Sequence, residues 1–114
     1  MDIPVERFGD VAVVAMPVEE LDAGNTAEFK RDMAPVLEGN TKVVLDLSRL
    51  RFIDSSGLGS FLSCLRRVNA RCGELKLCCL SQQVRTVIEL VRMHRMLDIF
   101  GTRDEALRAF QNQV

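Results

Sequence analysis

The sequence predicts an α/β fold with a mixed, mostly parallel sheet of about four or five strands and about four helices. Nearly continuous apolar runs are typical of strands buried on both faces. Segments with apolar residues at helical spacing separate these runs. The length of 114 residues fits one domain, residues 1–114, with its own hydrophobic core.

The expected strands are one weak candidate at residues 3–7 and three strongly apolar runs. Gly9 and Asp10 follow the weak candidate and can form the turn of an antiparallel hairpin with residues 11–16. The three runs are VAVVAM at residues 11–16, KVVLDL at residues 42–47 and ELKLCCL at residues 74–80. We expect these four strands to form one sheet.

Helical stripes lie between and after the strands. Gly39 is expected to end the first helix, and Thr102 is a plausible N-terminal cap of the last one. The stripes cover residues 25–37, 58–68, 84–91 and 106–110. Because helices and strands alternate, we expect right-handed crossovers and a functional site where strands end and helices begin.

Charge and hydropathy argue against several classes of function. With 15 basic and 16 acidic residues, the formal net charge is -1, so the positive field that attracts nucleic-acid phosphates is missing. Residues 11–16, the longest apolar run, are far fewer than the roughly 20 that cross a bilayer. Asp2 and Glu6 interrupt any signal peptide. We expect a cytoplasmic protein with no direct nucleic-acid binding and no membrane insertion.

The cysteines lack the spacing of a metal site. Cys64, Cys72, Cys78 and Cys79 contain no Cys-x-x-Cys pair. Neighbouring residues of a strand point to opposite faces, so Cys78 and Cys79 are expected to point apart. Reduced, partly buried thiols are the simplest interpretation. We therefore expect no metal and no other cofactor.

The segment FIDSSGLG, residues 52–59, lies at an expected strand-to-helix junction. Its residue types are compatible with three functions: a catalytic serine, a phosphate-binding turn and a serine that a kinase phosphorylates. A hydrolase elbow needs Gly-x-Ser-x-Gly, which is absent, and His94 is the only histidine available as a base. Two glycines at a helix start can bind phosphate, but no basic residue follows in the motif and Asp54 would repel the anion. Thirdly, the serines can accept phosphate from a kinase. The structural alternative is that a serine only caps the helix.

A longer stretch around this segment resembles a known family. VVLDLSRLRFIDSSGLGSFL, residues 43–62, resembles the signature of STAS-domain anti-sigma factor antagonists. EELDAGNTAEFK, residues 19–30, is similar to the family's Gly-Glu-Leu-Asp segment, with Glu19 in place of the glycine. Residues 73–90 are similar to the next strand and helix, and LDIF and EALRAF to the end of the domain. Arg92 stands where a glycine is common after the third helix.

The resemblance implies a STAS-like fold and regulation without catalysis. Members of the family bind an anti-sigma factor that is also a serine kinase, and thereby free a sigma factor. Phosphorylation by the kinase reverses the binding, and a metal-dependent serine phosphatase restores the active form. Carried over by motif, the phosphorylated residue is Ser55. The residues implied in partner binding are Asp22, Asp54, Ser56, Gly57 and Leu58.

Two other functions stay open at the level of the sequence. A non-switching STAS module would serve as a structural subunit of a signalling complex or of a lipid-transport assembly. An enzyme is the third possibility. Phosphate on Ser55 after incubation with a cognate kinase and ATP separates partner switching from the structural subunit. Turnover without any partner would support an enzyme.

Overall fold

The first two strands form an antiparallel hairpin at one edge of the main sheet. In the computed structural model, which describes residues 1–111, β1 (Val5–Phe8) pairs with β2 (Val11–Ala15). Gly9 occupies the turn with a φ of +63°, a left-handed conformation that glycine adopts at no steric cost. The expected hairpin is confirmed, although its first strand lies slightly later than residues 3–7.

Further strands extend the hairpin into a five-stranded sheet with the order β1-β2-β4-β6-β7. Every pair of neighbours beyond the hairpin is parallel. The added strands are β4 (Lys42–Asp46), β6 (Glu74–Cys78) and β7 (Asp98–Phe100). The sheet is therefore mixed and mostly parallel, as the alternation of apolar runs and helical stripes predicts.

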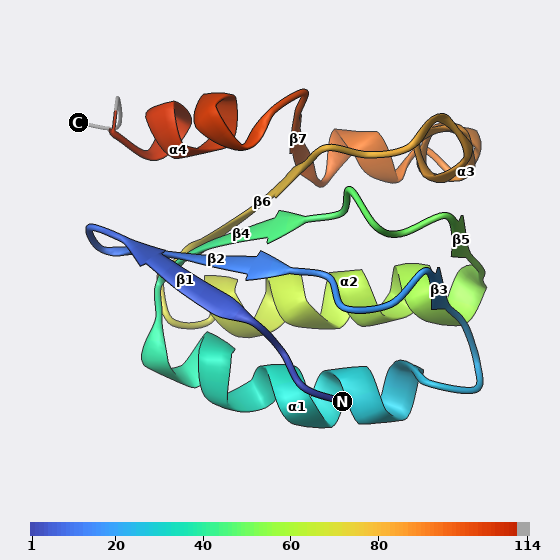
Figure 1. Ribbon diagram of the computed structural model, residues 1–114, viewed down its shortest axis with the longest axis horizontal. Coiled ribbons are helices and arrows are strands. Elements are labelled where there is room, and N and C mark those ends of the chain that lie inside the picture. The colour runs from blue at the N-terminus through green and yellow to red at the C-terminus, as the bar shows by residue number, and fades with distance from the viewer. Residues whose placement is uncertain (112–114) are drawn as a thin grey trace.

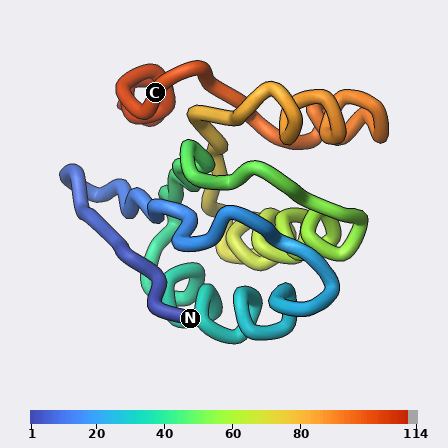
Figure 2. The backbone as a smooth tube through the Cα atoms, turned by 45° about the vertical axis from the view of Figure 1, so that its right-hand side comes forward, coloured from blue at the N-terminus to red at the C-terminus, as the bar shows by residue number. Residues whose placement is uncertain are grey.

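The helices cover both faces of this sheet (Figure 1). Helices α1 and α2 lie side by side on one face, α4 lies on the other, and α3 lies near the carboxyl ends of the parallel strands, as Figure 2 also shows. The helices are α1 (Thr26–Gly39), α2 (Ser55–Asn69), α3 (Gln82–Leu90) and α4 (Arg103–Gln111), with a 3₁₀ turn, η1 (Met93–Arg95), after α3. Within residues 1–111, no helix has both the length and the apolar character needed to cross a membrane.

The ends of the helices differ slightly from the sequence-based expectation. Helix α1 includes Gly39 as its last residue, and Asn40 after it is extended. Helix α2 begins at Ser55. The sequence pattern shows only its later part, because the residues of the first turn are polar or small and the apolar stripe starts at Leu58. Thr102 caps α4 as expected, since its Oγ1 accepts a hydrogen bond of 3.1 Å from the backbone N–H of Glu105.

Two cores hold the layers together. In the larger one, the rings of Phe29 and Phe61 meet edge to face between α1 and α2, with centroids 6.2 Å apart. In the smaller one, Ala106 and Phe110 of α4 pack on β2, β4 and β6. Lys76 is buried in this second core, where its Nζ lies 4.7 Å from the centroid of the Phe110 ring.

Three short strands are absent from the sequence-based expectation. One is β7, and the other two, β3 (Glu20–Leu21) and β5 (Phe52–Ile53), pair in parallel as a separate two-stranded sheet. A two-residue strand is too short to show an alternating pattern. Its existence depends on the partner strand that the fold brings alongside, so local sequence does not reveal it.

The expectation that Cys78 and Cys79 point to opposite faces of a strand is wrong. Strand β6 ends at Cys78, and Cys79 has a φ of +62°. This left-handed residue interrupts the pleat, so the alternation of side chains no longer applies. The two sulfurs and one carboxylate oxygen of Asp46 all lie within 4.8 Å of one another.

Candidate functional site

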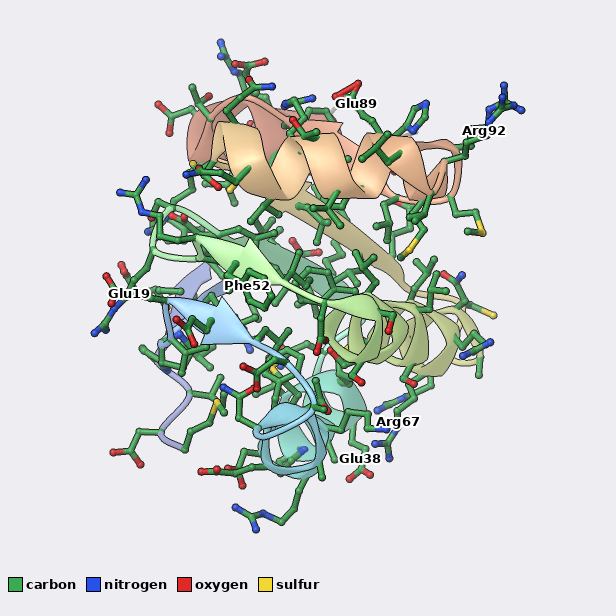
Figure 3. All side chains as sticks on the ribbon, turned by 90° about the vertical axis from the view of Figure 1, so that its right-hand side faces the viewer. Glu19, Glu38, Phe52, Arg67, Glu89 and Arg92 are labelled. Carbon is green, nitrogen blue, oxygen red and sulfur yellow. The ribbon has the colours of Figure 1, made fainter. Side chains whose placement is uncertain are left out.

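The turn before α2 and the loop before α1 meet because β3 and β5 pair in parallel. In this pair Glu20 lies opposite Phe52, and Leu21 lies opposite Ile53. The backbone N–H of Asp54 then donates to the carbonyl of Leu21 at 3.3 Å. Figure 3 views the molecule from this end, with β3 and β5 at the front. The predicted site residues from two distant parts of the chain are thus neighbours in space.

Asp54 is the N-terminal cap of α2 and also joins the two segments. Its Oδ1 accepts a hydrogen bond of 2.9 Å from the backbone N–H of Gly57, which has no acceptor within the helix. Its Oδ2 accepts a second one of 3.1 Å from the N–H of Ala23 in the loop before α1. The carboxylate therefore positions the start of α2 against this loop.

Ser55 and Ser56 are the first two residues of α2, and both are exposed. Within residues 1–111, neither hydroxyl makes a hydrogen bond, and the capping role belongs to Asp54. The structural alternative raised by the sequence, a serine that only caps the helix, therefore does not describe this turn. Both hydroxyls are accessible from solvent.

Gly57 and Leu58 lie beneath the serines and are buried. A Cβ on Gly57 would stand 2.5 Å from the carbonyl oxygen of Leu21 and 2.6 Å from Cγ1 of Ile53. Only glycine allows α2 to approach β3 and β5 so closely. Leu58 packs into the larger core. These two residues hold the turn in place, and the exposed surface of the turn is formed by their neighbours.

Asp22 lies in the loop before α1, half buried, in a compact turn. Its Oδ1 accepts a hydrogen bond of 2.9 Å from the N–H of Gly24, and its own N–H donates to Oδ1 of Asn25 at 3.0 Å. The Asn25 side chain also donates to the carbonyl of Glu20 at 2.8 Å. Sequence reasoning missed Asn25, although an Asx residue immediately before a helix is a known signal for such side-chain bonds.

Phe52 adds an exposed aromatic side chain to this end of the molecule. Its side chain is 52% exposed, and Figure 3 shows it on β5, on the same side of the view as Glu19. The backbone N–H groups of Arg51 and Phe52 both donate to the carbonyl of Glu19, at 2.7 and 3.1 Å. Aromatic residues are enriched in protein interfaces. Sequence reasoning missed Phe52 because an apolar residue beside a strand is ordinarily expected inside.

The geometry does not support a catalytic serine paired with His94. His94 lies in η1, after α3, and no hydrogen bond within residues 1–111 joins it to Ser55 or Ser56. A serine nucleophile needs such a base within hydrogen-bond reach. What the turn offers instead is a pair of accessible hydroxyl groups beside two carboxylates and an exposed aromatic ring.

Comparison with known proteins identifies the family. The model of the STAS domain family matches residues 2–106. The anti-sigma F factor antagonist of Paenibacillus polymyxa is 31% identical over 109 residues, which cover 94% of this chain and 92% of the relative. The crystal structure of TM1081 from Thermotoga maritima matches with a TM-score of 0.89 at 28% identity, covering 96% of this chain and 95% of that one.

A further match is to SpoIIAA, described as a Bacillus cell fate determinant and solved in its phosphorylated form. It has a TM-score of 0.69 at 22% identity and covers 96% of this chain and 99% of its own, a likeness that shows the shared fold. The family match extends over most of the chain, and the Paenibacillus relative resembles it along nearly its full length. The chain therefore belongs to the STAS domain family, among the anti-sigma factor antagonists.

Proposed function

We propose that this protein is a partner-switching anti-sigma factor antagonist that acts by binding and has no catalytic activity of its own. In the unphosphorylated form it binds an anti-sigma factor that is a serine kinase. Phosphorylation of Ser55 by that kinase releases it, and a metal-dependent serine phosphatase restores the binding form. The observation that carries the proposal is the turn itself: Ser55 is exposed at the start of α2, while Asp54 performs the capping.

The names of similar proteins support the class of partner. The Paenibacillus relative is named an anti-sigma F factor antagonist, and SpoIIAA has been solved in a phosphorylated form. The choice of Ser55 over Ser56 depends on the motif Asp-Ser-Ser-Gly-Leu, residues 54–58, in which the first serine is the acceptor in the family that it resembles. Both serines are exposed, so accessibility alone does not distinguish them.

The surface proposed to meet the kinase, which we call the switch surface, surrounds the exposed serines. Asp54 directly precedes the serines, and its hydrogen bond with Ala23 brings the loop that contains Asp22 to this turn. Phe52 supplies an exposed ring on β5. The switch surface consists of Asp22, Phe52, Asp54, Ser55 and Ser56. Gly57 and Leu58 act on binding indirectly, by fixing the position of the turn.

The fold tolerates a phosphate on Ser55 better than the complex does. A phosphate adds about -1.5 to -2 charges, and the partial positive charge of a helix N-terminus favours an anion at that position. Within the free protein the exposed serine leaves the phosphate in water. In the complex, Ser55 has to approach the nucleotide site of the kinase, where the new charge faces bound phosphates and loses water.

The loss of affinity follows from this contrast. An unpaired charge left in an interface typically costs about 2–5 kcal/mol. With about 1.4 kcal/mol for each tenfold change in affinity, phosphorylation weakens the complex by roughly one and a half to three and a half orders of magnitude. Asp brings one charge where phosphate brings nearly two, so Ser55→Asp causes a smaller loss. Ser55→Ala binds well and locks the protein in its binding state.

The decisive experiment captures the kinase from native cells with the unmodified protein and then reconstitutes the reaction. Calorimetric titration gives the affinity of the kinase for the unmodified, phosphorylated, Ser55→Asp and Ser55→Ala forms. We expect phosphate on Ser55 in near-stoichiometric amount and the order of affinities given above. If the phosphorylated protein binds the kinase as tightly as the unmodified one, switching is refuted and a non-switching structural subunit takes its place.

Ser56→Ala is the matched control for the assignment of the acceptor. Both serines are exposed and both lie in the first turn of α2, so the two alanine variants differ little in folding. We expect Ser56→Ala to be phosphorylated and Ser55→Ala to remain unmodified, as judged by phosphopeptide mapping. Phosphate on Ser56, with Ser55→Ala still modified, would assign the switch to the second serine.

A further inference from the structure

A second cluster of reactive side chains lies on the α4 side of the sheet, apart from the switch surface. Asp46 ends β4 and Cys78 ends β6, and the parallel register pairs these two residues directly. Cys79 follows with a φ of +62°, which brings its sulfur back toward the other two. A left-handed conformation is costly for a residue that carries a side chain. The chain thus adopts a strained conformation at the point where these ligand atoms converge.

We propose that Asp46, Cys78 and Cys79 form a binding site for a thiophilic divalent cation such as Zn²⁺. Two sulfurs and one carboxylate oxygen, all within 4.8 Å of one another, supply three ligands. Tetrahedral zinc with bonds of about 2.3 Å to sulfur and about 2.0 Å to oxygen places its ligand atoms roughly 3.5–3.8 Å apart. The three atoms therefore need to move together by only about 1 Å, and water completes the coordination.

Hydrogen bonds from Arg103 and Ser48 hold the carboxylate of Asp46 in place. Its Oδ2 accepts hydrogen bonds from Nη2 and Nε of Arg103, at 2.8 and 3.2 Å, which use both of its lone pairs. Its Oδ1 accepts a hydrogen bond of 3.0 Å from the backbone N–H of Ser48, and the side chain of Ser48 donates a further hydrogen bond to this carboxylate. A cation that binds the carboxylate therefore competes with the Ser48 hydroxyl. Such supporting hydrogen bonds around a ligand are the rule at metal sites in proteins.

Charge and access also fit a bound cation. Two thiolates and one carboxylate carry three negative charges, which a divalent cation and the guanidinium of Arg103 neutralise together. Asp46 and Cys78 are buried, whereas Cys79 is only partly buried and gives access from solvent. Burial is the largest cause that raises the pKa of the Cys78 thiol, so the cation has to displace a firmly held proton. This competition lowers the affinity relative to a site of preformed thiolates.

The competing interpretation is that the cysteines only fill space. Cys78 belongs to the smaller core with Ala106 and Phe110, where a small apolar side chain is useful in any case. The ion pair with Arg103 accounts for the position of Asp46, and packing accounts for Cys78, but neither requires the partly exposed sulfur of Cys79 to lie within 4.8 Å of both. A purely packing role predicts no selective binding of a thiophilic cation, so the two interpretations differ in a measurable way.

The test uses Co²⁺ as a spectroscopic probe and Zn²⁺ in competition with a chromophoric chelator, on protein kept reduced with a phosphine. We expect one equivalent of Co²⁺ to produce a sulfur-to-cobalt charge-transfer band that Zn²⁺ abolishes. Cys79→Ser should weaken binding by more than about 100-fold, which exceeds the usual effect of changing a supporting residue. Zn²⁺ should raise the thermal midpoint of the unaltered protein and leave that of Cys79→Ser unchanged.

Cys72→Ser is the matched control, because Cys72 is also a left-handed cysteine, with a φ of +60°, and lies exposed outside the cluster. It should bind Zn²⁺ as the unaltered protein does. Asp46→Asn keeps both thiols and tests the carboxylate, so it should bind more weakly. Absence of the charge-transfer band, or equal affinity in Cys79→Ser and Cys72→Ser, would overturn the proposal.

Discussion

At the scale of the residue, Gly57 shows how a single missing Cβ positions the switch surface. A methyl group at this position would meet the Leu21 carbonyl at 2.5 Å, and a backbone atom in a paired strand cannot move away cheaply. Gly57→Ala should therefore lower the free energy of unfolding by about 1–3 kcal/mol, as overpacking does elsewhere. Chemical denaturation measures the change.

Gly59→Ala provides the control in the same helix. Nothing lies within 4 Å of the position that its Cβ would take, so alanine is free to improve the helix. The expected gain is about 0.5–1 kcal/mol. Equal effects of the two substitutions would show that the close approach at Gly57 does not determine the stability of this turn.

The two aspartates of the switch surface should separate stability from binding. Asp54 caps α2 and also holds Ala23, so Asp54→Ala should cost about 0.5–2 kcal/mol, the usual loss of a cap. Among the described residues, the side chain of Asp22 accepts a single hydrogen bond, from Gly24 in its own turn. Asp22→Ala should leave the thermal midpoint nearly unchanged and weaken binding or phosphorylation by the kinase. A large loss of stability with normal binding would make Asp22 a purely structural residue.

At the scale of the element, the backbone after α3 is strained at a residue that is not glycine. Arg92 has a φ of +62° at the position where the family resemblance leads one to expect glycine. A left-handed conformation costs a residue with a side chain about 1–2 kcal/mol, and glycine avoids this cost. The greater entropy of glycine in the unfolded chain takes back about 0.5–1 kcal/mol of the stability gained. Arg92→Gly should therefore stabilise the protein slightly. Arg95→Gly, an exposed position without positive φ, should destabilise it in the same denaturation experiment.

The buried stem of a lysine fills space between α4 and the sheet. Lys76 is only 4% exposed, and its Nζ lies 3.1 Å from Oδ2 of Asp98 and 4.7 Å from the centroid of Phe110. Asp98 is largely exposed, so water can solvate it when the lysine is replaced. Lys76→Met, which keeps the apolar stem, should leave stability within about 1 kcal/mol of the original or raise it. Lys76→Ala should cost about 2 kcal/mol or more, because it leaves a cavity beneath Phe110.

At the scale of the whole molecule, phosphorylation should change binding without changing the fold. Ser55 is exposed and its hydroxyl makes no hydrogen bond within residues 1–111, so the phosphate breaks no side-chain contact. Circular dichroism of the phosphorylated protein should match that of the unmodified protein, with similar thermal midpoints. Loss of secondary structure on phosphorylation would mean that release occurs by unfolding rather than by repulsion at the switch surface.

Local patterns in the sequence determined the fold class and identified the segment that we propose as the centre of the switch surface. The apolar runs became β2, β4 and β6, and the helical stripes became α1 to α4, because buried strands and amphipathic helices each leave a periodic pattern. Residues 54–58 were identified from their motif. Both kinds of signal lie within short stretches of chain, so they are readable without any knowledge of the fold.

Only the tertiary structure decided which segments became neighbours. Strands β3 and β5 have two residues each and exist because they pair, and their pairing brings Asp22 beside Asp54. The convergence of Asp46 with Cys78 and Cys79 likewise depends on the β4–β6 register and on one left-handed residue. These features arise between residues far apart along the chain. No local pattern encodes them, since a contact depends on the path of both segments.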